Sequence, residues 1–150
     1  MSFLGYIFIS FIILVIDQIV KWQIVIHIPL NTTISFIPHI LSLSNVRNTG
    51  AAWSIFAGQQ LLFFIISIIA LIVMVVLLKR NNHDKLFALA LAFMIGGTLG
   101  NFLDRLRLGY VIDMFTLDFI NFPIFNIADC ALTIGVVLLI IALFKGEDDV

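Results

Sequence analysis

Four long runs of apolar residues dominate the hydrophobic pattern of the chain. They cover approximately residues 3–25, 61–78, 86–103 and 122–144. An α-helix needs about 20 apolar residues to cross the hydrocarbon core of a bilayer, and each run is close to that length. The pattern therefore predicts an all-α membrane protein with four transmembrane helices, organised as one domain over residues 1–150.

The two connections that follow the first and third runs carry other patterns. Residues 40–46 alternate apolar and polar side chains, which is typical of a strand with one exposed face. We expect a small extracytoplasmic β-sheet there, lying on the membrane surface. Residues 106–121 alternate apolar and acidic side chains, and we expect them to form an interfacial loop or helix.

The loop between the second and third runs predicts the orientation in the membrane. This loop, residues 79–85, is short and rich in basic residues, which is typical of loops on the cytoplasmic side. Both termini would then be cytoplasmic, and the other two connections would lie outside.

Charged and amide side chains gather near the outer ends of the predicted helices, whereas the cytoplasmic halves are almost purely apolar. These outer residues are Asp17, Lys21, Asn101, Asp104, Arg105, Asn126 and Asp129. Asn126 is expected on the same helical face as Asp129, three residues earlier. Ionisable groups within a membrane are costly and mark functional sites, so the pattern predicts one site that faces outward.

Composition narrows the class of protein further. The chain is 62% hydrophobic and 11% charged, whereas a soluble domain has about a quarter charged residues. Its net charge of -1 and the lack of a basic patch argue against a nucleic-acid partner. The single cysteine, Cys130, excludes an internal disulfide and is interpreted as a small apolar helix residue. His27, His39 and His83 are not at ligand spacing, so a metal site is not expected. No other cofactor is predicted.

Asp113 and Asp129 are the candidate catalytic pair. Two carboxylates that converge at low dielectric share a proton, because they cannot both ionise easily. Such a pair supplies a base that activates water and an acid that polarises a carbonyl, which suffices for peptide hydrolysis. Taken alone, Asp113 is more typical of a solvated loop residue, and the outward clustering of polar residues is what favours a catalytic role.

The sequence pattern is also compatible with other roles for the charged residues. Asp17 and Lys21 are spaced as an i, i+4 ion pair that stabilises a helix end. Arg105 is compatible with binding a carbonyl, binding a lipid headgroup or marking the interface. A proton-coupled transporter with Asp17 and Asp129 as a relay would need polar residues through the whole membrane depth. A membrane subunit would use the Asp17–Lys21 and Asp104–Arg105 pairs to dock a partner.

Five separated motifs, in order along nearly the whole chain, resemble the lipoprotein signal peptidases (signal peptidase II), which are bacterial aspartyl proteases of the inner membrane. The matching segments are residues 17–21, 47–54, 96–105, 111–115 and 122–129. The resemblance implies a membrane aspartyl endopeptidase that removes the signal peptide from diacylglyceryl-modified prolipoproteins. It implies cleavage on the N-terminal side of the lipidated cysteine, at the outer face of the bacterial cytoplasmic membrane.

The resemblance also assigns roles to particular residues. Asp113 and Asp129 are implied to be catalytic, and residues 48–54 are expected to clamp substrate against the helices. The substrate-binding or supporting residues that it implies are Asp17, Lys21, Asn48, Gly97, Asn101, Arg105, Asn126 and Ala128. We further expect contact with membrane lipid, inhibition by the cyclic peptide globomycin, and action as a monomer.

Overall fold

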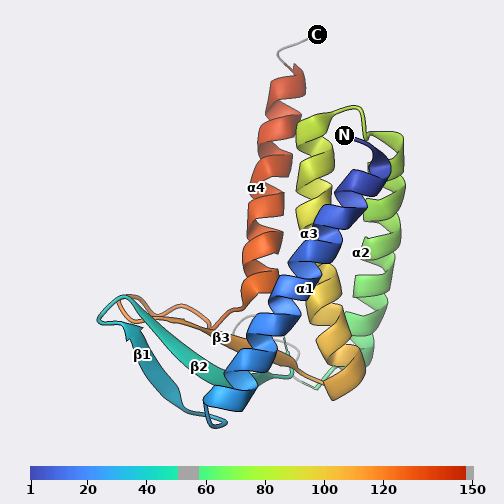
Figure 1. The fold of residues 1–150 in the computed structure, drawn as a ribbon. Coiled ribbons are helices and arrows are strands. Elements are labelled where there is room, and N and C mark those ends of the chain that lie inside the picture. Colours follow the sequence, from blue (N-terminus) through green and yellow to red (C-terminus); the bar gives the residue numbers. More distant parts are fainter. Residues whose placement is uncertain (51–57, 148–150) are drawn as a thin grey trace.

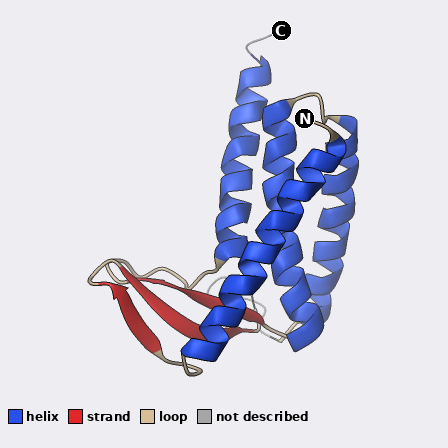
Figure 2. Cartoon of the chain, viewed as in Figure 1, coloured by secondary structure: helices blue, strands red, loops and turns tan. Residues whose placement is uncertain are grey.

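The computed structural model describes residues 1–50 and 58–147, which form four helices and a three-stranded sheet (Figures 1 and 2). The elements are α1 Phe3–His27, β1 Thr33–Ile37, β2 Leu41–Asn48, α2 Gln60–Arg80, α3 Lys85–Leu108, β3 Val111–Leu117 and α4 Ile127–Glu147. The predicted four helices and small sheet are confirmed. Residues 51–54 of the expected substrate clamp lie outside the described residues.

The four helices lie side by side, with both termini at one end of the bundle and the sheet at the other (Figure 1). Each is long and apolar enough to cross a membrane. Helix α3 contacts all three other helices and is the central one. Half of the residues in the most apolar stretch of α3 are buried inside the protein, compared with 11–22% in the other three helices. The apolar side chains of those three helices therefore largely face outward. Such outward-facing apolar surface suits a bundle surrounded by lipid.

Glycines allow α3 and α4 to approach each other closely. A Cβ on Gly97 would collide with the carbonyl oxygen of Ala128 and lie 2.9 Å from Leu132 Cγ. A Cβ on Gly135 would lie 2.9 Å from the carbonyl oxygen of Ala90. Small residues at such positions let transmembrane backbones pack directly. The beginning of α4 is thereby held against α3.

Gly97→Ala is expected to destabilise the protein by about 1–3 kcal/mol, because the added methyl group must push α4 away from α3. Thermal unfolding of the purified protein in detergent measures the loss. Gly5→Ala is the matched control, since its Cβ would meet the end of the flexible Met1 side chain, which can move away. Equal melting temperatures for the two variants would contradict the close-packing explanation.

The sheet is antiparallel with strand order β1-β2-β3. A row of hydroxyl groups crosses it, with Thr33 Oγ1 2.9 Å from Ser44 Oγ and Ser44 Oγ 2.8 Å from Thr116 Oγ1. On β3, Asp113 lies opposite Val46 of β2, and Asn48 of β2 lies opposite Val111. The sheet therefore places Asn48 and Asp113 next to each other.

The second outer connection differs from its expected form. It was expected as an interfacial loop or helix, but α3 continues to Leu108, Gly109 turns the chain at φ 77°, and β3 pairs with β2. The alternation over residues 111–117 is a strand pattern, and β2 supplies the partner that makes a strand favourable. Asp113 thus lies on a strand of the sheet, where it is 3% exposed, and is not a solvated loop residue.

Helix α4 begins at Ile127, five residues later than predicted. Asn126 caps it, because its Oδ1 accepts the Asp129 N–H at 2.9 Å while Asp129 Oδ2 accepts the Asn126 N–H at 3.1 Å. This reciprocal pair is a capping box, which defines a helix start. The expectation that Asn126 lies on the helical face of Asp129 is therefore wrong. Before the cap, Phe125 pairs with Phe115 of β3, which joins the sheet to the start of α4.

Candidate active site

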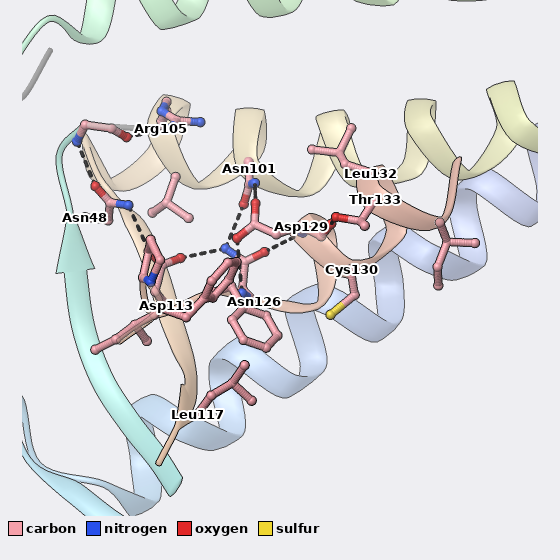
Figure 3. Close-up of a pocket in the computed structure, with 17 residues that line it drawn as sticks. Asn48, Asn101, Arg105, Asp113, Leu117, Asn126, Asp129, Cys130, Leu132 and Thr133 are labelled. Carbon is pink, nitrogen blue, oxygen red and sulfur yellow. Dashed lines mark hydrogen bonds between the residues drawn. The ribbon is translucent and has the colours of Figure 1, made fainter. Parts of the chain in front are cut away.

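Asp113 and Asp129 are joined through one residue, Asn126, at the sheet end of the bundle (Figure 3). The Asn126 side chain donates to Asp113 Oδ1 at 2.7 Å, and its backbone N–H donates to Asp129 Oδ2 at 3.1 Å. Asn126 is fully buried. It therefore holds two carboxylates from different elements, β3 and α4, at a fixed separation.

Two further amides complete the hydrogen bonding of the aspartates. Asn48 Nδ2 donates to Asp113 Oδ2 at 2.9 Å, and Asn101 Nδ2 donates to Asp129 Oδ1 at 2.8 Å (Figure 3). Amide donors favour the ionised form of a carboxylate without adding a charge to the site. Each aspartate thus receives N–H groups on both of its oxygens.

The two aspartates differ in burial. Burial raises the pKa of Asp113 from its ordinary value of 3.8 to about 6, although hydrogen bonds from Asn48 and Asn126 and the charge of Lys21 lower it. The negative charge of Asp129 adds to the upward shift of the Asp113 pKa. Asp129 is only partly buried and lines the adjoining cavity. Asp113 therefore retains its proton to a higher pH than an ordinary aspartate does.

A cavity of about 680 Å³ adjoins the aspartates. Such a volume is in the range of cavities that bind small ligands or peptide segments. The charged and amide residues that line it are Asn48, Asn101, Arg105, Asp113, Asn126 and Asp129. The apolar residues of its walls include Val111, Leu117, Phe122, Phe125, Leu132 and Ile134. Cys130 also lines the cavity and is partly buried. The arrangement brings reactive carboxylates next to an apolar surface.

Arg105 holds the backbone at Gly50, shortly after the end of β2. Its Nη2 donates to the carbonyl oxygen of Gly50 at 3.0 Å, and the Gly50 N–H donates to Asn48 Oδ1 at 2.9 Å. The Arg105 guanidinium also lies 4.6 Å from the centre of the Phe63 ring. Of the interpretations open from the sequence, the structure shows carbonyl binding. Arg105 thereby orients Asn48 toward Asp113.

Lys21 is the centre of a second buried polar cluster. Its Nζ lies 2.9 Å from Asp17 Oδ2 and 2.9 Å from Asp104 Oδ2, so the expected Asp17–Lys21 ion pair is confirmed. Lys21 also donates to Asn101 Oδ1 at 3.1 Å, which links this cluster to the aspartate pair. All three charged residues are at most 2% exposed. They therefore offer no surface for docking a partner.

Sequence reasoning placed Asp104 among the outer polar residues without giving it a role in the site, and it gave no role to Gln18. Asp104 pairs with Lys21, whereas its sequence neighbour Arg105 binds Gly50. Gln18 Nε2 donates to Asp104 Oδ1 at 2.8 Å and to Asp17 Oδ2 at 3.2 Å. The spacing of Asn101 and Asp104 on one helical face was a usable signal for Asp104. Within the described residues, His, Cys, Asp and Glu form no group of three that could hold a metal ion.

Solved structures define the class of protein first. The fold matches two structures described as bacterial membrane enzymes, determined by the in meso method at 2.3 Å and 1.9 Å resolution. The first has a TM-score of 0.91 and 38% identity over 97% of this chain and 90% of that chain. The second has a TM-score of 0.87 and 40% identity over 94% of this chain and 93% of that chain. The protein is thus an integral membrane enzyme of bacterial type.

Sequence comparisons then identify the family. A model of the family described as signal peptidase (SPase) II, peptidase family A8, matches residues 9–145. The lipoprotein signal peptidase of Lactiplantibacillus plantarum is 50% identical over 142 residues, covering 95% of each chain. That of Streptococcus agalactiae serotype Ia is 50% identical over 142 residues, covering 94% of this chain and 92% of its own. The chain belongs to the lipoprotein signal peptidase family, whose members are aspartic peptidases. The resemblance inferred from the five motifs is confirmed. Membership of this family replaces the two alternative interpretations, a proton-coupled transporter and a membrane subunit that docks a partner.

Proposed function

We propose that this single membrane domain removes the signal peptide from diacylglyceryl-modified prolipoproteins, and that Asp113 and Asp129 perform the hydrolysis. The cut would fall on the N-terminal side of the lipidated cysteine. The observation that supports the assignment most strongly is the Asn126 bridge, which holds two carboxylates beside a cavity with apolar walls. The family's prolipoprotein substrates agree with a cavity that accepts both a peptide and an acyl chain.

Within this proposal we give the two aspartates different roles because they differ in burial. Asp129, the less buried of the two, is the base that takes a proton from water in the cavity. Asp113, whose pKa is raised to about 6 by burial, is the acid that donates a proton to the scissile carbonyl oxygen. Substrate that fills the cavity excludes water and favours the protonated form further.

The chemical steps then follow from these positions. Water oxygen attacks the carbonyl carbon, while its proton moves to Asp129 and the carbonyl oxygen receives the proton of Asp113. Collapse of the tetrahedral intermediate breaks the C–N bond. The leaving amine takes the proton held by Asp129, and the hydroxyl proton returns to Asp113. Each carboxyl ends in its starting state, and no covalent enzyme intermediate forms.

The remaining predicted site residues would position the pair and its substrate. Asn48 and Asn126 hold Asp113, while Asn101 holds Asp129. Arg105 holds the outer connection at Gly50. In the same proposal, Gly97 and Ala128 allow α3 and α4 to pack closely, and Asp17 and Lys21 support the site from α1.

We place the site at the outer face of the cytoplasmic membrane. The basic loop 79–85 joins α2 and α3 at the end of the bundle that also carries both termini (Figure 1). Basic loops stay in the cytoplasm, so the sheet and the aspartates would lie on the other side. The lipid-bearing substrate would enter sideways from the membrane into the cavity, the chain would act as a monomer, and globomycin would compete for the same cavity.

Cleavage of matched precursors tests the proposed substrate. Purified full-length protein is expected to cut a diacylglyceryl-modified prolipoprotein directly before the modified cysteine, as mapped by mass spectrometry. The same precursor without the diacylglyceryl group is the control and is expected to react at least about 100-fold more slowly, because it lacks the acyl contacts that position the peptide. Globomycin is expected to inhibit the reaction competitively. Equal cleavage of both precursors would contradict recognition of the lipid. It would not affect the assignment of the two aspartates, which is tested separately with the Asp113→Asn and Asp129→Asn variants.

A further inference from the structure

We propose that Asp17, Lys21 and Asp104, together the Lys21 cluster, are positioning residues that set the separation of the two aspartates. The proposal rests on the assignment of Asp113 and Asp129 as the catalytic pair. It adds Asp104 to the site and gives the buried ion pairs a role in the reaction itself. Each member acts through the backbone or an amide and does not touch the reacting atoms.

Two buried carboxylates hold the peptide groups immediately before the two aspartates. Asp17 Oδ1 accepts the N–H of Ala128 at 2.9 Å, and Ala128 directly precedes Asp129. Asp104 Oδ2 accepts the N–H of Ile112 at 3.1 Å, and Ile112 directly precedes Asp113. The two contacts are equivalent in form, although they come from different helices, α1 and α3. Each one fixes the backbone from which a reacting side chain projects.

Lys21 joins the two contacts into one unit. Its ammonium group lies 2.9 Å from each of the two carboxylates, so it links the backbone position of Asp129 to that of Asp113. A buried charge without its partner is strongly unfavourable, so neither carboxylate can leave Lys21 easily. Gln18 adds a second link, since its Nε2 donates to both carboxylates. Two sets of contacts therefore maintain the separation of the two aspartates. One is the set of ion pairs around Lys21, and the other is the pair of hydrogen bonds from Asn126.

Lys21 also helps to set the direction of an amide that contacts the pair. Lys21 and Asn126 Nδ2 each donate to Asn101 Oδ1 at 3.1 Å, so Asn101 Nδ2 faces Asp129 Oδ1 at 2.8 Å. With the amide reversed, its nitrogen would face the ammonium group and its oxygen would face a carboxylate. Both contacts would then be repulsive. Lys21 thus helps Asn126 to keep the Asn101 donor on Asp129.

Space for the cluster is provided at Gly100. A Cβ on Gly100 would lie 2.6 Å from Asp17 Oδ2 and 3.1 Å from the side chain of Ala128. The absence of a side chain at this position lets Asp17 reach across α3 to the first turn of α4. A role limited to anchoring the end of α1 would not require this approach to the residue before Asp129.

The geometry distinguishes two substitutions of Asp104. Its Oδ2 serves both Lys21 and Ile112, while its Oδ1 accepts only from Gln18, a bond that an asparagine with its oxygen in the Oδ2 position would lose. Asp104→Asn can therefore keep the functional oxygen, whereas Asp104→Leu cannot. In steady-state cleavage of the lipidated precursor, Asp104→Leu is expected to lower kcat by about 100-fold with little change in KM. Asp104→Asn is expected to lower kcat by less than about tenfold.

Ser10→Ala is the matched control for loss of stability alone. Ser10 is a buried polar residue of α1 that donates to the carbonyl oxygen of Ala92 in α3 at 2.8 Å, away from the cavity. Its removal weakens the same helix pair, so a lower melting temperature with unchanged kcat is expected. If Asp104→Leu matches Ser10→Ala in kcat, the proposal is wrong. Equal kcat losses in Asp104→Leu and Asp104→Asn would also overturn it, since the Ile112 contact would then be irrelevant.

Lys21→Met adds a spectroscopic readout, the titration of Asp113, to the measurement of kcat. The charged groups that act on Asp113 are Asp129 on α4, Lys21 on α1 and Arg105 on α3. Because the charge of Lys21 lowers the Asp113 pKa, its removal is expected to move the Asp113 titration to higher pH, while Ser10→Ala leaves it in place. An unmoved titration in folded Lys21→Met would overturn the proposal. If Lys21→Met does not fold, the two Asp104 variants decide.

The same assay separates this proposal from the assignment of the pair. Full activity in Asp113→Asn or Asp129→Asn would refute the catalytic pair, whatever the cluster variants do. Loss of activity in both of those variants, together with unchanged kcat in Asp104→Leu, would refute only the positioning role.

Discussion

Asp113→Asn and Asp129→Asn are each expected to lower kcat for the lipidated precursor by on the order of 10⁴-fold or more. Asparagine keeps the size of the side chain but can neither take the proton of water nor donate an acid proton. The fold should survive both changes, because the carboxylates are surrounded by amides that can rotate to meet a new amide. Asp113→Asn should also remove the cost of an ionised carboxylate at a site that is 3% exposed.

Asp118→Asn is the matched control for these two variants. Asp118 follows β3 directly, is exposed and accepts a hydrogen bond from Ser42 Oγ at 2.9 Å, away from the cavity. Its change is expected to leave kcat unaltered. If either Asp113→Asn or Asp129→Asn behaves like Asp118→Asn in the cleavage assay, hydrolysis by this pair is excluded.

Asn126→Leu is expected to have the second largest effect, a fall in kcat of about 10²–10³-fold. Leucine fills a similar volume but removes the donor to Asp113 and the acceptor that caps α4. Loss of the cap is expected to cost about 1 kcal/mol of stability in addition. Because the backbone N–H still reaches Asp129, the base should remain near its place while the acid loses its position.

Asn45→Leu separates the catalytic from the structural part of that effect. Asn45 is also a buried asparagine, but its Nδ2 donates to the carbonyl oxygen of Ile28 at 2.7 Å, and it does not line the cavity. It is expected to lower the melting temperature while preserving kcat. Similar kcat values for the Asn126 and Asn45 variants would show that the Asn126 bridge has only a structural role.

The membrane fold was predictable because its signal is local. A run of apolar residues of sufficient length needs no partner to be identified, as the run at residues 61–78 illustrates within α2. The start of α4 was missed because apolarity continues before Asn126, whereas the helix begins where the capping pair of Asn126 and Asp129 forms. The alternation at residues 111–117 was visible, but only pairing with β2 makes it a strand.

The candidate site was predictable in its residue types but not in its connections. The outward gathering of charges indicated Asp113 and Asp129, yet no spacing shows that Asn126 would bridge them. Asp104 was grouped with its neighbour Arg105, because sequence proximity suggests pairing. In the fold these two side chains point to different partners, Lys21 and Gly50. Long-range contacts of this kind depend on helix packing, which apolar patterns do not specify.

The protonation state of Asp113 tests the central claim most directly. Infrared difference spectra of purified protein, recorded from pH 4 to 9, report the carbonyl band of a protonated carboxyl group. Because burial raises the pKa of Asp113 to about 6, a protonated carboxyl is expected at pH 5 that is lost as the pH rises through about 6. The band should be absent from Asp113→Asn and should remain in Asp118→Asn. A titration near pH 6 that persists in Asp113→Asn, or none between pH 5 and 8 in the unaltered protein, would contradict Asp113 as the acid of the pair.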